Sequence, residues 1–172
     1  MKLHTERLTL APLCTDHFET TCLYSMDPEN TKMMCFLPCD DRNEVMDYLI
    51  KSDRQWKMDV PEYLDVAVLL DGEHIGAVSI EFLEDHSVGE LGWIIRKDHW
   101  GKGYALESAK VFMDYCAKRF HIRHFIAHCD SENNASMRVM EKLGMNIAKR
   151  YQGRKNRNSE EISEESLYEI FM

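Results

Sequence analysis

The sequence has no long hydrophobic run. Nothing in its 172 residues approaches the roughly 20 consecutive apolar residues of a membrane-spanning helix. The opening stretch, MKLHTERLTLAP, alternates polar and apolar residues and lacks the hydrophobic centre of a signal peptide. We therefore expect a cytoplasmic protein with no membrane partner.

Positively charged residues are also fewer than negatively charged ones. The chain has 21 lysines and arginines against 30 aspartates and glutamates, which gives a formal net charge of -9. This balance argues against a nucleic-acid backbone as the main partner. It is compatible with a cationic substrate.

The six cysteines are scattered and do not form a disulfide or zinc pattern. Because no secretory signal precedes them, reduced thiols are the better interpretation. Cys35 and Cys39 are the closest pair, but no CxxC motif accompanies them. The sequence therefore predicts no metal.

The length and composition fit one domain over residues 1–172. A chain of this size can bury roughly 70% of the surface that its unfolded form exposes. The pattern predicts one strand, two helices, three strands, a helix, a strand, a helix and two strands, which is a mixed α/β domain with an antiparallel first half. The expected strands are 7–13, 62–70, 74–83, 88–96, 123–129, 145–152 and 166–172, and the expected helices are 15–27, 42–57, 101–119 and 131–144. Residues 153–165 are polar and predict a mobile loop.

The stretch HWGKGYALESAK, residues 99–110, places Gly101 and Gly103 where the helix should begin. The start of a helix presents unpaired N–H groups and the positive end of the helix dipole. Glycines there let phosphate oxygens approach the backbone, so the stretch fits an anion site. The alternative is a strand-to-helix turn that uses glycine for its geometry alone. Neither a P-loop nor a third glycine of a dinucleotide fingerprint is present.

A wider window resembles a known family. GELGWIIRKDHWGKGYALES, followed by CDSENNASMRVMEKLGM, is similar to the GNAT superfamily of N-acetyltransferases, and more narrowly to its RimJ/RimL type. TERLTLAPL near the N-terminus resembles the first strand of that type, so the resemblance covers residues 5–172. It implies a strongly twisted, mostly antiparallel sheet flanked by helices, and acetyl-coenzyme A as co-substrate.

The resemblance also implies residues for the coenzyme. The pyrophosphate would lie on the N–H groups of Trp100, Gly101, Lys102, Gly103, Tyr104 and Ala105. The pantetheine arm would pair with Trp93, Ile94 and Ile95, and Asn133 and Ser136 would lie beside it. Asp98 departs from the glutamine or arginine that the family often has there, and we expect it to point away from the pyrophosphate.

Acetyl transfer to an amine needs a base, because an alkyl amine has a pKa near ~10.4 and is mostly protonated at neutral pH. Glu90 is the candidate, since strand alternation places it on the same face as Ile94. Ser136 is the candidate acid for the departing thiolate, by its match to the family serine. The alternatives are a solvated carboxylate at Glu90, a helix-end serine, and an N-cap at Asn133.

Other residues have weaker claims. Tyr168 and Tyr104 could donate protons, but they fit packing better. His124 and His128 share a strand face, but His121 does not lie on it. Because only two of the three histidines share a face, the pattern does not favour a metal site. Methionines at 26, 33, 34, 46 and 58 are candidates for lining an acceptor pocket.

The predicted activity is acetyl transfer to a primary amine: a protein N-terminus, an amino acid, a polyamine or an amine-bearing small molecule. We expect residues 15–60 and 152–165 to form the acceptor site. One alternative is an acyl-coenzyme A sensor without catalysis, and another is an interaction domain whose glycines only turn the chain. The sequence is compatible with a monomer or a homodimer.

Overall fold

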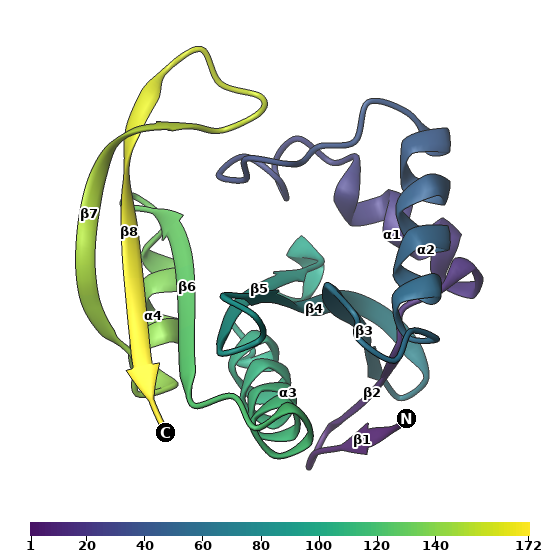
Figure 1. The fold of residues 1–172 in the computed structure, drawn as a ribbon. Coiled ribbons are helices and arrows are strands. Elements are labelled where there is room, and N and C mark those ends of the chain that lie inside the picture. The colour runs from purple at the N-terminus through teal and green to yellow at the C-terminus, as the bar shows by residue number, and fades with distance from the viewer.

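The computed structural model describes residues 1–172 as one mixed sheet flanked by helices (Figure 1). The strands are β1 (Leu3–His4), β2 (Leu8–Pro12), β3 (Tyr63–Leu70), β4 (Glu73–Leu83), β5 (Val88–Ile95), β6 (His124–Asp130), β7 (Asn146–Lys155) and β8 (Ile162–Phe171). The helices are α1 (Phe18–Ser25), α2 (Arg42–Gln55), α3 (Tyr104–Phe120) and α4 (Asn134–Lys142), with 3-10 turns η1 (Thr15–His17) and η2 (Lys97–His99). This order confirms the predicted mixed α/β class.

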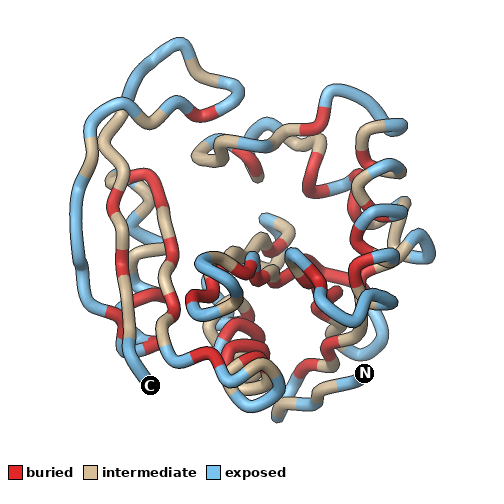
Figure 2. The backbone as a smooth tube through the Cα atoms, in the orientation of Figure 1, coloured by how far each residue is buried: buried red, intermediate tan, exposed pale blue.

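The sheet has the strand order β1-β2-β3-β4-β5-β6-β8-β7. Every neighbouring pair is antiparallel except β5 and β6, which run parallel. β7 is an edge strand and is mostly exposed (Figure 2). The only parallel junction therefore lies inside the sheet, between its N-terminal and C-terminal halves.

That junction is short. β5 and β6 pair over three positions, from Val88 opposite His124 to Glu90 opposite Ile126. Beyond Glu90, β5 continues to pair with β4 as far as Ile95, and β6 continues to pair with β8 as far as Asp130. The two strands therefore separate after Glu90, and we call the place where they part the β5–β6 opening.

The two faces of the sheet have different covers. Leu91 on β5 and Ala127 on β6 belong to the main core, together with Phe112 of α3 and Met140 of α4. A smaller core joins Val45 and Leu49 of α2 to residues of β3 and β4, and Ile94 of β5 packs against it. Because side chains alternate along a strand, Glu90 lies on the same face as Ile94 and points away from the face that α3 and α4 cover.

Several predicted boundaries need correction. Residues 153–165 are not one loop, since β7 extends to Lys155 and β8 begins at Ile162. The predicted helix 15–27 is a 3-10 turn followed by the short α1, and β1 was not predicted at all. Helix 101–119 begins only at Tyr104, because Gly101 and Gly103 adopt positive φ angles of 75° and 83°.

None of the helices combines the length and the apolar character needed to cross a membrane.

Candidate active site

The glycine segment before α3 is a turn with free backbone donors. Gly101 and Gly103 both have positive φ, a conformation that L side chains rarely adopt. The first N–H after Trp100 to find a backbone acceptor is that of Glu107, which donates to the Gly103 carbonyl at 3.1 Å. A Cβ added at Gly101 would meet nothing within 4 Å, so the turn is open on that side. The N–H groups of residues 101–106 are therefore available to an anion, and the turn fits a pyrophosphate.

The side chain of Arg7 contacts this turn and the first turn of α3. Its Nη1 donates to the Lys102 carbonyl at 3.0 Å, and its Nη2 lies 2.6 Å from the Glu107 carboxylate. The guanidinium also sits 4.6 Å from the centre of the Tyr104 ring. Glu107 accepts hydrogen bonds from Thr5 and Arg7. The sequence analysis did not identify Arg7, because nothing in the sequence spacing pairs it with a residue 100 positions away.

The end of β5 lies next to the same turn. The Arg96 N–H donates to Ile75 on β4, so by alternation the N–H and carbonyl groups of Trp93 and Ile95 point toward the β5–β6 opening. The Ile95 carbonyl accepts from the Trp100 indole at 2.7 Å and from the Asn30 side chain at 3.2 Å. Trp93 thus presents an unpaired strand edge, while Ile95 helps to fix the loop.

Asn133 and Ser136 lie at the start of α4, directly after β6. The Asn133 side chain accepts from the Ser136 N–H at 3.1 Å, so Asn133 is the N-cap of the helix. Because β5 and β6 are parallel, the helices that follow them begin at the same edge of the sheet. The structure therefore places the glycine turn and the Asn133–Ser136 turn on the two sides of the β5–β6 opening.

Glu90 sits where the opening begins and contacts a histidine from the neighbouring strand. Its Oε1 lies 2.9 Å from Nδ1 of His128, and the two side chains are 32% and 25% exposed. This hydrogen bond, the largest contribution, raises the pKa of His128 above its ordinary value. The sequence singled out both residues but gave no reason to pair them.

The charged residues Asp98 and Lys102, at and next to the turn, each have a protein partner. Asp98 accepts from Arg96 at 2.5 Å, and this contact lowers the pKa of its carboxyl. Lys102 donates to the Asp98 carbonyl at 3.2 Å. The charge of the Asp98 carboxylate is therefore balanced by Arg96.

The other candidate residues have structural partners. Tyr104 and Tyr168 are 9% and 5% exposed within the main core, and burial raises the pKa of Tyr168. His124 pairs with Glu169 at 2.9 Å, so the two strand histidines bind different carboxylates. His121 ends α3 at a positive φ of 59°.

The tip of the β7–β8 hairpin, residues 156–161, is tied to the segment between α1 and α2. Arg157 donates to the Phe36 carbonyl at 2.9 Å and contacts Asp40 and Glu44, each at 2.7 Å. Its N–H donates to the Met34 carbonyl, and the Arg154 side chain donates to the Met33 carbonyl. These contacts bring together the two segments that the sequence assigned to the acceptor, which approach each other in Figure 1. They also correct the prediction of a mobile loop.

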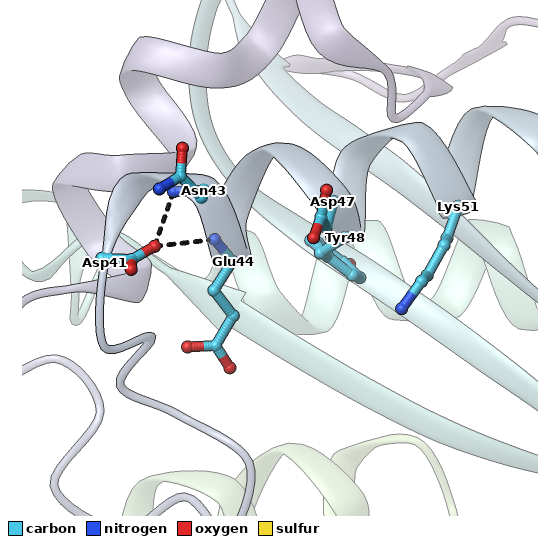
Figure 3. Close-up of a pocket in the computed structure, with 6 residues that line it drawn as sticks. All are labelled: Asp41, Asn43, Glu44, Asp47, Tyr48 and Lys51. Carbon is cyan, nitrogen blue, oxygen red and sulfur yellow. Dashed lines mark hydrogen bonds between the residues drawn. The ribbon is translucent and has the colours of Figure 1, made fainter.

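A surface pocket of about 470 Å³ lies along α2 (Figure 3). Its lining residues are Asp41, Asn43, Glu44, Asp47, Tyr48 and Lys51. The Asp41 side chain accepts from the N–H groups of Asn43 and Glu44, which makes it the N-cap of α2. These residues fall within the range 15–60 that the sequence assigned to the acceptor, and Glu44 is also a partner of Arg157. None of the residues predicted for the coenzyme, the base or the acid lines the pocket.

Comparison with known proteins decides the family. The Acetyltransferase (GNAT) domain matches residues 7–146, which is most of the chain. The chain belongs to the GNAT acetyltransferases. The predicted family is thereby confirmed, and with it an acetyl-coenzyme A-dependent acyltransferase activity.

Individual relatives agree with this assignment. An uncharacterised N-acetyltransferase p20 of Bacillus licheniformis is 27% identical over 142 residues, which cover 82% of this chain and 80% of that protein. An acetyltransferase of the GNAT family from Bacillus anthracis has a TM-score of 0.85 at 22% identity, with 99% and 98% of the two chains covered. A RimL ribosomal L7/L12 alpha-N-protein acetyltransferase in complex with coenzyme A has a TM-score of 0.89 at 15% identity, with 100% and 98% covered. At these identities the two structures show a shared fold.

Proposed function

We propose that residues 1–172 act as one acetyltransferase domain that transfers the acetyl group of acetyl-coenzyme A directly to a primary amine. In this proposal Glu90 provides the base function that removes the amine proton, and Ser136 protonates the departing thiolate. The observation that supports it most is the β5–β6 opening, which has Glu90 at its origin and two helix starts at its edge.

The coenzyme would lie along this opening. The N–H groups of residues 101–106 would hold the pyrophosphate, and the free edge of Trp93 would accept the pantetheine arm as an added strand. Asn133 would keep Ser136 at the start of α4. The coenzyme supplies the acetyl group as a thioester, and holding this thioester beside the amine provides much of the acceleration.

The two faces of the sheet separate the two proton transfers. Glu90 points to the face on which Ile94 packs against the α1–α2 half, whereas α4 packs in the core on the opposite face. An amine that reaches the opening from the Glu90 face would lose its proton there. The thiolate would then leave on the side where α4 presents Ser136.

The acceptor would bind between β5, the segment from α1 to α2, and the β7–β8 tip. Arg154 and Arg157 fix that tip on Met33, Met34 and Phe36. With a net charge of -9, the protein favours a cationic acceptor over an anionic one. The acceptor class is therefore an amine-bearing cation, such as a polyamine, an amino acid amide or a protein N-terminus.

A panel of amines tests the proposal. Purified protein is incubated with acetyl-coenzyme A and spermidine, tyramine, kanamycin, a free amino acid or a peptide with an N-terminal serine or alanine. Release of free thiol is followed, and mass spectrometry identifies the acetylated amine. We expect at least one amine to be acetylated, and Glu90→Gln and Ser136→Ala each to reduce turnover by about 10²- to 10⁴-fold.

Two results would contradict the proposal in different ways. Tight coenzyme binding without turnover of any amine would favour a sensor. Full turnover in Glu90→Gln and Ser136→Ala would keep the activity but remove the roles assigned to these residues.

A further inference from the structure

The Glu90–His128 contact lies at the point where the β5–β6 opening begins. Glu90 is opposite Ile126 in the last register pair, and His128 is two residues further along β6 on the same strand face. The pair therefore lies at the end of the junction, where the opening begins. Both side chains are partly exposed, so a substrate can reach them.

The contact fixes which ring nitrogen of His128 has the proton. An ionised carboxylate can only accept a hydrogen bond, so Nδ1 of the neutral ring donates to Glu90 Oε1 at 2.9 Å. Nε2 then has a free lone pair, and no protein group hydrogen-bonds to it. A carboxylate on one ring nitrogen increases the basicity of the other.

We propose that Glu90 and His128 act as a dyad, in which Nε2 of His128 accepts the amine proton and Glu90 orients the ring and stabilises its charged form. This rests on the proposed function and deepens it, because it makes His128 the catalytic base and Glu90 its positioning residue. As the amine nitrogen bonds to the acetyl carbon, the carbon–sulfur bond breaks. The amine attacks in its neutral form, and the proton that its nitrogen then loses goes to Nε2 of His128. The thiolate takes a proton from Ser136, which regains one from water.

The charged groups around His128 come from three strands. Glu90 on β5 and Glu165 on β8 favour the imidazolium, whereas Arg154 on β7 and the partial burial of the ring oppose it. The net effect is a raised pKa for His128. The base is therefore lost as the pH falls through a value above 6.5, which would appear as an acid limb in the pH profile of kcat/KM.

The chain contains a matched control for this pair. His124 and Glu169 also meet at 2.9 Å, with side chains 26% and 35% exposed. His124 is on the same strand face as His128 but lies opposite Val88, at the other end of the β5–β6 pairing. Its ring stacks on Phe171 with centroids 4.1 Å apart. It therefore shares the chemistry of the proposed dyad and lies away from the opening.

The first experiment compares His128→Gln with His124→Gln. kcat/KM is measured from pH 5.5 to 9 with spermidine, or with whichever amine of the panel turns over fastest. We expect the kcat/KM of His128→Gln to be lower than that of the wild type by about 10²- to 10⁴-fold, and its pH profile to have no acid limb. His124→Gln should keep the activity and the limb. Glu90→Gln should move the limb to lower pH, because the carboxylate that raises the pKa of His128 is gone.

The second experiment needs no substrate. The ring of His128 is followed by NMR through a pH titration, and it should titrate above pH 6.5 in the wild type and lower in Glu90→Gln. This readout separates the dyad from the proposed function, since the histidine titrates whether or not an amine is found. A limb that persists unchanged in His128→Gln, or a His128 titration that Glu90→Gln does not move, would overturn the dyad. Glu90 could then still act alone as the base.

Discussion

Arg7 is the residue that most clearly links a distant part of the sequence to the coenzyme site. It directly precedes β2, yet its guanidinium bonds to the carbonyl of Lys102, the residue between the two glycines. It does not occupy the N–H groups that the proposal assigns to the pyrophosphate. Its effect on binding should therefore come through the shape of the turn.

Replacement of Arg7 by alanine should weaken acetyl-coenzyme A binding about tenfold. The variant loses the guanidinium that bonds to the Lys102 carbonyl, so the backbone donors of the turn are no longer held in one arrangement. Isothermal titration of acetyl-coenzyme A measures the effect.

Arg42 supplies the matched control for Arg7. It pairs with Glu19 at 2.5 Å and sits 4.6 Å from the Phe18 ring, as Arg7 does with Glu107 and Tyr104. Arg42→Ala removes the same kinds of contact far from the turn and should leave the affinity unchanged. Equal losses in both variants would mean that the effect of Arg7 is general destabilisation.

At the scale of elements, the β7–β8 hairpin and the segment between α1 and α2 act together. Arg157 bonds to Phe36, Asp40 and Glu44, which lie more than 110 positions earlier in the chain. Hydrogen bonds to Glu44 and Asp40 raise the pKa of the Arg157 guanidinium. The hairpin tip is thus held at the proposed acceptor site.

Arg157→Ala should raise the KM for the amine several-fold and leave the Kd of acetyl-coenzyme A unchanged, because the tip lies on the acceptor side only. Steady-state kinetics with the amine varied at saturating coenzyme measure this. Arg150→Ala is the control, since Arg150 also lies on β7 but only approaches Glu164 at 3.6 Å and is 56% exposed. A loss of coenzyme affinity in Arg157→Ala would contradict the assignment of the hairpin tip to the acceptor side.

The packing of α1 on β4 contains a buried histidine. His74 accepts or donates a hydrogen bond with Thr20 of α1 at 2.6 Å, and its Nε2 has no partner. Burial, together with the nearby His17, lowers the pKa of His74 to about 3. In the unfolded chain the ring would titrate near ~6.5, so it is charged there before it is charged in the folded protein.

The free energy of unfolding should therefore fall as the pH drops below 6.5. The slope that this one group contributes is at most about 1.4 kcal/mol per pH unit. Thermal or urea unfolding at pH 7.5 and pH 5.5 measures the slope, and His74→Gln should flatten it. The exposed His4 provides the control, and His4→Gln should keep the wild-type slope. An unchanged slope in His74→Gln would contradict the burial effect.

Most of the fold follows from local patterns in the sequence. The Asp71-Gly72 turn, the glycines at 101 and 103 and the cap at Asn133 each fix a boundary through local backbone chemistry. The β7–β8 hairpin was misjudged because residues 153–165 are polar. Its order comes from Arg154 and Arg157, whose side chains bond to partners 113 to 121 positions earlier in the chain. The Glu90–His128 contact could not be predicted either, because it joins residues far apart in the sequence and depends on the register of β5 and β6.

At the scale of the whole molecule, the excess of negative charge should steer cationic acceptors. With a net charge of -9, the kcat/KM of a polycation such as spermidine should fall several-fold between 0.02 M and 0.3 M salt. A singly charged amine such as tyramine should be affected less. Kinetics at a series of salt concentrations test this, and equal salt dependence for the two amines would show that net charge plays no part.

The central claim is that acetyl-coenzyme A binds to the turn before α3, and one titration tests it most directly. Gly101→Glu puts a carboxylate on this turn, and Gly72→Glu is the control. Both glycines have positive φ, 75° and 86°, and both have open space where a Cβ would be. The backbone strain of the two variants is therefore similar.

Isothermal titration of acetyl-coenzyme A into the wild type, Gly101→Glu and Gly72→Glu should give binding to the first and third proteins and a loss of at least tenfold in the second. Equal affinity in all three proteins, or no binding to the wild type at millimolar coenzyme, would contradict the assignment of the glycine turn as the pyrophosphate site.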